Sequence, residues 1–394
     1  MEAFEQRAVE HLLNLLAIEG VSGRESLVSA FLKKELLAAG CRSEWIFEDE
    51  AHLRLGEGFE TGNLIVRLPG TVSGERLLFS AHMDTVPLCR EAHPVVRGNR
   101  VVSAGETGLG GDDRAGCAAL LTMAEFLLKN KVPHPPITLL FTIAEEIGLF
   151  GAREVQFEAL GSPVMGFNLD GEDPEEVVVG AMGAVRWTAR IFGRSAHSGL
   201  EPEKGVSAGL VLARAISRIE TQGYFGRIRM DGKAGTSNVG TIHGGEATNQ
   251  VMDRVEVRGE CRSHDADFLE KIVAVHQSCF EQAAESVLND AGESARVEFS
   301  TESDYRAFRL ADSEPCVLRA EAAVKNLGLT PRQVAMDAGL DANPFNEKGF
   351  PCVTLGTGTH HFHTVDEYVE IGEYQTTCRI LLEIVRLTQS TLCP

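Results

Sequence analysis

A chain of 394 residues exceeds the size at which one hydrophobic core usually suffices, so we expect two domains. The composition, with 43% hydrophobic and 24% charged residues, is ordinary for a folded α/β protein. The formal net charge of −20 argues against nucleic acid and against anionic membrane surfaces as partners.

Neither the cysteines nor the first residues indicate export. The nine cysteines are scattered and include no Cys-x-x-Cys pair, so a disulfide framework is not expected. The opening Met-Glu-Ala-Phe-Glu-Gln lacks a basic region followed by a long apolar segment. No window holds about eighteen uninterrupted apolar residues, the length that a membrane span needs. We therefore expect a cytoplasmic protein without a membrane span.

Residues 1–180 alternate strands and helices. The predicted segments are helices 4–19 and 25–39, strands 62–68, 77–80, 137–143 and 164–169, a hairpin over 95–103, and a helix that starts at Asp112-Asp113. This alternation predicts an α/β domain with a doubly wound, mixed or parallel sheet and helices on both faces. In such sheets, functional sites form at the carboxyl ends of strands.

The pattern changes to α+β over residues 181–303. Strands are predicted at 184–192, 237–242, 255–261 and 297–300, and helices at 205–220 and 265–287. This order is close to a split βαβ, or ferredoxin-like, arrangement. From 304 to 394 the first pattern resumes, with a helix over 315–327, a loop around Asp341, a strand over 352–355 and a closing helix over 370–388. The sequence therefore predicts a domain inserted between two parts of a catalytic domain.

Asp112 and Asp113 follow a glycine-rich loop and precede an apolar helix. An isolated pair of this kind is usually an N-cap followed by a favourable first-turn acid. Here further ligand-type residues follow other predicted strands: His82, Glu145, Glu146, Asp170, and one of His360, His361 and His363. A mixture of His, Asp and Glu without thiolates suits Zn²⁺, Co²⁺ or Mn²⁺. We expect Asp112 to bridge two such ions.

Two short patterns, each formed by a pair of residues, support this interpretation but do not decide it. His82 and Asp84 lie two apart in an extended segment, so both side chains point to one side, and a metal-bound histidine needs its second ring nitrogen held. Taken alone, a His-x-Asp pattern is more often a histidine beside an aspartate on the protein surface than part of a metal site. Glu145-Glu146 is equally compatible with a solvated corner, but a hydrolytic dinuclear site needs one glutamate as ligand and another as general base.

Taken in order, these and other short motifs resemble the M20 metallopeptidase family, and within it the peptidase T-like branch. The motifs are Ser-Ala-His-Met-Asp-Thr-Val (80–86), Gly-Asp-Asp-Arg-Ala-Gly (111–116), Glu-Glu-Ile-Gly (145–148), Leu-Asp-Gly (169–171), Ala-His-Ser-Gly (196–199), Asp-Ala-Asn (341–343) and His-Thr-Val-Asp-Glu (363–367). They span nearly the whole chain. Leu340 stands where the family commonly has Ser or Thr, and Arg114 where it commonly has Lys.

The resemblance implies a cocatalytic site with two Zn²⁺ per chain. His82 and Asp170 would hold one ion, Glu146 and His363 the other, and Asp112 would bridge them. It also implies a cis peptide bond after Asp112.

The resemblance implies roles for five further residues. Glu145 would be the general base, and Asp84 would hold His82. The inserted domain, 181–303, would serve for dimerisation or as a lid, and in a homodimer His197 would reach the partner subunit's site. Asn249 and Arg262 would bind the substrate.

These features predict a metal-dependent enzyme that removes the N-terminal residue of a di- or tripeptide. An amidohydrolase that cleaves N-acyl or N-carbamoyl amino acids uses the same chemistry and stays open. A non-catalytic binding protein on the same fold is the alternative from a different class.

Overall fold

The computed structural model describes residues 2–387, so the last predicted position of the closing helix, residue 388, lies outside the described residues. These residues form two compact units. The first unit takes residues 2–180, 309–336 and 340–387, and the second takes Ala181–Phe308 and Asp337–Gly339. Each unit has a hydrophobic core of its own.

The first unit contains a nine-stranded sheet in the order β1-β2-β6-β3-β7-β16-β8-β14, with β15 paired to β8. The strands are β1 (Ile46–Glu48), β2 (Leu64–Leu68), β3 (Leu77–His82), β6 (Ile137–Thr142), β7 (Met165–Gly171), β8 (Glu176–Ala181), β14 (Phe308–Arg309), β15 (Arg332–Met336) and β16 (Cys352–Gly356). Neighbours from β6 to β16 run parallel, whereas β1, β2 and β8 pair antiparallel. The predicted mixed α/β sheet is confirmed.

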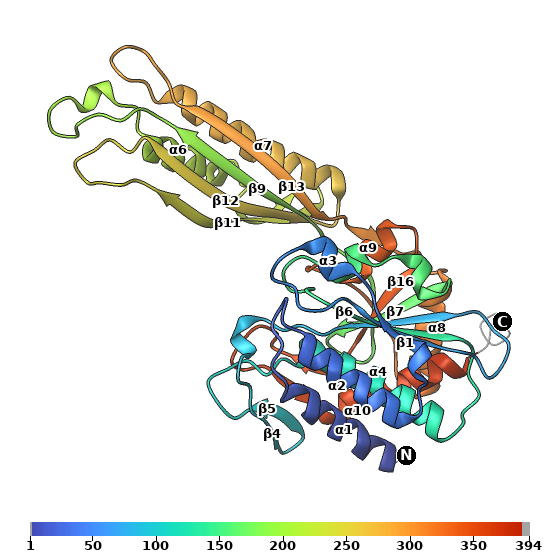
Figure 1. The fold of residues 1–394 in the computed structure, drawn as a ribbon. Helices are drawn as coiled ribbons and strands as arrows, with labels where there is room; N and C mark the ends of the chain where they lie inside the picture. Colours follow the sequence, from blue (N-terminus) through green and yellow to red (C-terminus); the bar gives the residue numbers. More distant parts are fainter. Residues whose placement is uncertain (1, 388–394) are drawn as a thin grey trace. The chain divides into compact units, whose positions relative to one another are not determined.

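Helices cover this sheet (Figure 1). They are α1 (Glu2–Leu16), α2 (Ser26–Ala39), α3 (Ala51–Leu55), α4 (Gly111–Lys129), α5 (Phe150–Glu154), α8 (Pro315–Asn326), α9 (Ala342–Glu347) and α10 (Ile371–Arg386). Helix α4 packs on β3 and β7, and α1, α2 and α10 pack on α4. Strands β3 and β6 are buried along their whole length, which explains their nearly continuous apolar sequence.

A small sheet, β17-β18-β5-β4, lies beside the main one in the same unit. It contains β4 (Pro94–Arg97), β5 (Arg100–Ser103), β17 (Thr359–His360) and β18 (Tyr368–Glu370). The predicted hairpin over 95–103 is confirmed as β4 and β5. Because β18 pairs with β5, this sheet holds the C-terminal histidine segment against the chain that leads into α4.

The second unit is a five-stranded antiparallel sheet, β10-β11-β12-β9-β13, with two helices packed on it. Its elements are β9 (Gly183–Phe192), α6 (Ala208–Thr221), β10 (Gly226–Met230), β11 (Lys233–Gly244), β12 (Arg254–Ser263), α7 (Ala266–Ser286) and β13 (Arg296–Tyr305). Without the edge strand β10, the order is that of a split βαβ arrangement. The unit ends at Phe308 rather than at residue 303, because β13 pairs with β9 as far as Tyr305.

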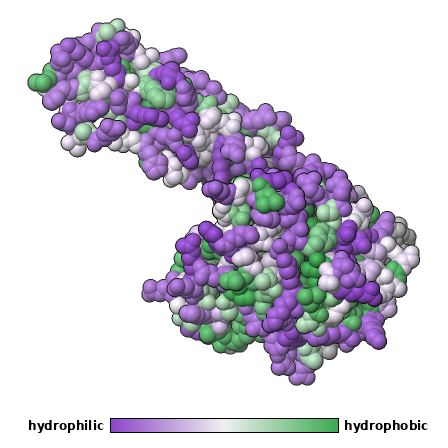
Figure 2. Space-filling model, in the orientation of Figure 1, coloured by the Kyte–Doolittle hydropathy of each residue, from purple (hydrophilic) through white to green (hydrophobic). Residues whose placement is uncertain are grey.

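Hydrophilic side chains cover most of the surface visible in Figure 2, as the large acidic excess predicts. Among the described helices, none combines the length and the apolar character needed to cross a membrane. All eight cysteines within residues 2–387 are buried free thiols.

Candidate metal centre

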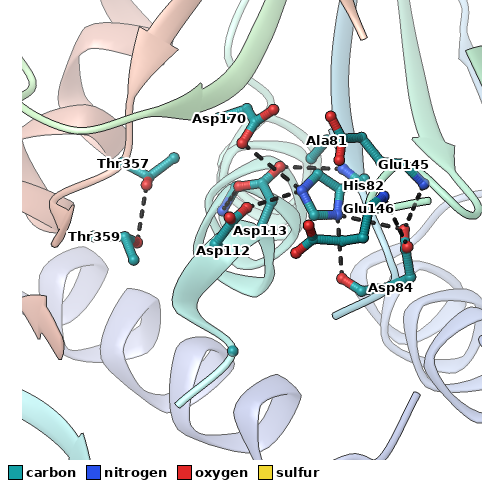
Figure 3. Close-up of polar contacts among 12 residues, drawn as sticks. Ala81, His82, Asp84, Asp112, Asp113, Glu145, Glu146, Asp170, Thr357 and Thr359 are labelled. Atoms are coloured by element: carbon teal, nitrogen blue, oxygen red, sulfur yellow. Dashed lines mark hydrogen bonds and ion pairs between the residues drawn. The ribbon is translucent and has the colours of Figure 1, made fainter. Parts of the chain in front are cut away.

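Polar side chains gather where three neighbouring strands of the first unit end. His82 is the last residue of β3, Glu145 and Glu146 follow β6, and Asp170 is near the end of β7. Strand β3 runs parallel to both β6 and β7, so the carboxyl ends of all three lie at one edge of the sheet. Figure 3 shows these side chains around the His82 ring.

The two adjacent acids at the start of α4 have different environments. Asp112 and Asp113 have non-helical backbone angles, and the peptide bond between them is cis. The Asp113 carboxylate accepts hydrogen bonds from the amides of Gly116 (2.9 Å) and His82 (3.1 Å), so it caps the helix. The carboxylate of Asp112 is left to face the strand ends.

The Asp112 carboxylate lies between two histidines. Its Oδ1 is 2.9 Å from His82 Nε2, and its Oδ2 is 3.2 Å from His363 Nε2. Glu146 Oε2 is 2.9 Å from the same nitrogen of His363, and Asp170 Oδ1 is 3.7 Å from that of His82. Each oxygen of Asp112 therefore faces one histidine–carboxylate pair.

Asp84 organises the residues behind this cluster. Its carboxylate accepts hydrogen bonds from the amides of Glu145 (3.0 Å) and Glu146 (3.2 Å) and from the hydroxyl of Ser22 (2.6 Å). Its Oδ1 is also 3.4 Å from His82 Nδ1. One fully buried carboxylate thus orients the histidine ring and both glutamate residues.

The three histidines near the C-terminus, His360, His361 and His363, have different environments. His363 faces Asp112 and Glu146, as described above. The ring of His360 lies between Glu172 (2.9 Å) and Glu373 (2.5 Å), and His361 lies against the ring of Tyr368. Among the described residues, His363 is thus the only one of the three that contacts the strand-end cluster. We use this name for His82, Asp112, Glu145, Glu146 and Asp170.

The charges in the cluster perturb one another strongly. Burial raises the pKa of Glu145 and that of Asp170 well above the usual carboxyl range, and neighbouring carboxylates raise both further. Burial and the charge of Asp112 raise the pKa of Glu146 to about 7. Although burial opposes it, the hydrogen bonds from His363 and His82 lower the pKa of Asp112. Because these buried carboxylates repel one another, a cation bound between them would stabilise their ionised forms.

A comparison with protein families identifies the chain. The family model described as Peptidase family M20/M25/M40 matches residues 78–387, more than half of the sequence. The chain belongs to the M20 metallopeptidase family. It is therefore an enzyme, not a non-catalytic binding protein on the same fold.

Similar proteins cover almost the whole chain. The uncharacterized protein YqjE of Bacillus subtilis (strain 168) is 32% identical over 97% of this chain and 98% of its own length. The structure of a tripeptidase from Staphylococcus aureus subsp. aureus Mu50 has a TM-score of 0.86 and 32% identity, covering 97% of this chain and 98% of that one. The aminopeptidase PepT from Bacillus cereus ATCC 10987 has a TM-score of 0.83 and 31% identity, with the same coverage.

The M20 assignment agrees with the chemistry of the strand-end cluster. His82, Asp112 and Glu146 each offer one ligand atom, and these atoms lie within 4.8 Å of one another. Neutral imidazole nitrogen and carboxylate oxygen are ligands that Zn²⁺ accepts. The residues present therefore fit a metal ion.

Two further buried carboxyl groups lie near the cluster, and the sequence predicts a role for neither. Glu25 accepts hydrogen bonds from the amides of Gly23 (2.8 Å) and Ala144 (3.0 Å), and burial with the charge of Asp84 raises its pKa to about 7. Asp341 accepts a hydrogen bond from the Thr142 hydroxyl, and burial raises its pKa to about 6. Asp341 belongs to the Asp-Ala-Asn motif (341–343), whereas the only local signal for Glu25 is Ser22-x-x-Glu25, which resembles a helix capping box.

The remaining predicted site residues belong to the second unit. His197 is exposed, and its Nδ1 accepts hydrogen bonds from the amides of Gly199 and Leu200, each at 3.2 Å. Asn249 lies close to it in the fold, because the amide of Ser198 donates a hydrogen bond to the Asn249 carbonyl at 3.0 Å. Arg262 is half-buried on β12 and pairs with Glu260 on the same strand.

Proposed function

We propose that this M20 enzyme holds two Zn²⁺ ions at the strand-end cluster, with Co²⁺ or Mn²⁺ as replacements. Asp112 would bridge the ions, because its two oxygens face different histidines. His82 and Asp170 would complete one side, and Glu146 and His363 the other. This disposition of the Asp112 carboxylate is the observation that carries the proposal.

Such ions supply Lewis acidity and favour deprotonation of water near neutral pH. Glu145 is the group of this chain that would move protons. Glu145 lies just after the end of β6, next to the proposed ligand Glu146. Its backbone amide donates a hydrogen bond to the Asp84 carboxylate, which fixes its position. Glu145 would accept a proton from the attacking water and return it to the amine that leaves.

The substrate we propose is a short peptide, cleaved after its N-terminal residue. Support comes from the tripeptidase and the aminopeptidase named above, each more than 30% identical over nearly the full chain. His197 would donate a hydrogen bond to the developing oxyanion, Arg262 would bind the substrate carboxylate, and Asn249 would contact the peptide.

We further propose a cytoplasmic homodimer that forms through the second unit, with each His197 serving the other subunit's centre. The buried free thiols of the described residues support a reducing compartment. Closed two-fold symmetry makes such an exchange of residues reciprocal.

Two measurements test the proposal together. Elemental analysis of purified protein should find two divalent ions per chain. The same preparation should cleave free tripeptides but neither N-acetylated tripeptides nor N-carbamoyl amino acids, because an aminopeptidase requires the free amine. Hydrolysis confined to the N-blocked compounds would instead favour the amidohydrolase.

A further inference from the structure

Glu367 lies four residues after His363, immediately before β18, and its side chain is buried. Its Oε2 accepts hydrogen bonds from the amides of Leu109 (2.7 Å) and Gly110 (2.8 Å). Its Oε1 accepts one from the amide of Asp112 (3.1 Å). One carboxylate therefore binds three backbone donors of the segment that leads into α4.

The segment that Glu367 binds is shaped to surround a carboxylate. Gly110 has a φ of 78°, in the left-handed region that glycine adopts without strain. A side chain at Gly108 would lie 3.3 Å from Glu367 Oε2 and 2.8 Å from the sulfur of Cys89. The glycines thus let the backbone approach the carboxylate closely.

We propose that Glu367 is a positioning residue that sets the separation between Asp112 and His363. It reaches Asp112 through that residue's own amide, and it reaches His363 through four residues of chain. No contact with metal or substrate is required of it. This inference rests on the proposed dinuclear centre. It adds a residue that determines how the bridging Asp112 is placed relative to the second ion, which is the one that Glu146 and His363 would hold.

The chemistry of the contact requires a carboxylate. Both oxygens of Glu367 accept hydrogen bonds, so a glutamine must turn its NH₂ group toward one set of backbone N–H donors. Glu367→Gln therefore loses either the bond to Asp112 or the pair to Leu109 and Gly110. Asp366→Asn removes the charge of the neighbouring, exposed carboxylate and is the matched control.

The first measurement uses metal-free protein. Hydrogen–deuterium exchange, followed by mass spectrometry of peptides that cover residues 108–112, reports on these three amides. Glu367→Gln should exchange faster in this segment than the wild type and Asp366→Asn. Peptides from the second unit should exchange equally in all three proteins, which separates a local effect from general destabilisation.

The second measurement is a two-step titration of the same three proteins with Co²⁺, followed by visible absorption and electron paramagnetic resonance. Substituting residues that orient metal ligands typically costs 10- to 100-fold in affinity. In Glu367→Gln the second ion should bind about 10- to 100-fold more weakly, and the magnetic coupling between the two ions should change. The first ion should bind as in the wild type.

The outcomes separate the two proposals. A wild type that binds fewer than two ions contradicts the dinuclear centre, whatever the variant does. A wild type that binds two coupled ions, together with a Glu367→Gln protein that matches it in affinity and spectrum, overturns the positioning role alone. Faster exchange over 108–112 combined with weaker binding of the second ion supports it.

Discussion

At Asp84 a single carboxylate joins three parts of the site. The backbone amides of Glu145 and Glu146 both donate to it, so one carboxylate holds two adjacent glutamates for which we propose different roles. Asp112 and Asp113 show the same division, because one caps α4 and the other faces two histidines. Neighbouring acids in this site are thus distinguished by their hydrogen-bond partners.

This division predicts that Glu145→Gln and Glu146→Gln differ in kind. Glu145→Gln should keep both metal ions, because the proposed base is not a ligand, and should lose about 10²- to 10⁴-fold in kcat. Glu146→Gln should lose metal. Elemental analysis and steady-state kinetics on peptide substrate measure both quantities. Loss of metal from Glu145→Gln alone would exchange the two roles.

At the scale of residues, the sequence indicates which side chains end strands but not what holds them. His82, Glu145 and Asp170 follow apolar runs, so their meeting at one sheet edge is predictable. The partners of Ser22, Glu25 and Glu367 include polar groups far away in the chain. No local pattern encodes such contacts, since they arise only when the fold is complete.

Among the elements, those with strong periodicity were predictable and those defined by pairing were not. Helix α9 forms where a loop was expected, and the edge strand β15 was missed because its five residues pair only at the margin of the sheet. Strand β13 is longer than predicted, since its polar second half is held by β9. Tertiary pairing overrides weak local preference in these cases.

The link between α1 and α2 depends on Arg114. Its buried guanidinium donates hydrogen bonds to the carbonyls of Leu15 (3.2 Å), Ile18 (3.1 Å) and Gly20 (3.0 Å). Arg114→Met leaves these carbonyls without their donor and should lower the free energy of unfolding by about 3 kcal/mol. Urea unfolding measures the loss. Arg24→Met, at an exposed arginine of the same link, is the control and should change stability by less than about 1 kcal/mol.

Glu25 immediately precedes α2, and its burial should make the free energy of unfolding depend on pH. Its Oε1 accepts both hydrogen bonds, and its Oε2 has no hydrogen-bond partner. Burial and the charge of Asp84 raise the folded pKa to about 7 from 4.5, so the folded state binds the proton more tightly. The favourable contribution is complete below pH 4.5 and is lost as the pH rises through 7.

Glu25→Gln keeps an oxygen for both amides and cannot ionise. In metal-free protein it should be within about 1 kcal/mol of the wild type at pH 5 and exceed it by about 3 kcal/mol at pH 8 in urea unfolding. An equal difference between the two proteins at both pH values would contradict the raised pKa.

For the whole molecule, the proposed exchange of His197 predicts complementation between inactive subunits. Glu145→Gln and His197→Ala homodimers should both be nearly inactive. Equal amounts reassorted at random give half mixed dimers, each with one complete site of two, so about a quarter of wild-type activity should return. Native mass spectrometry confirms the mixing. Mixed dimers without activity would place His197 outside the partner's site.

The stretch that the family model matches is shorter than the folding unit that contains it. The family match begins at residue 78, yet β2 (Leu64–Leu68) pairs with β6 along its length. Ser22 and Glu25 also precede the matched stretch, and they hold Asp84 and Ala144. A fragment that began at residue 78 would expose an unpaired edge on β6 and would lack the Ser22 hydroxyl that donates to Asp84. Residues 2–77 therefore keep the edge of β6 paired and the Asp84 carboxylate supported, although they lie outside the stretch that the family model matches.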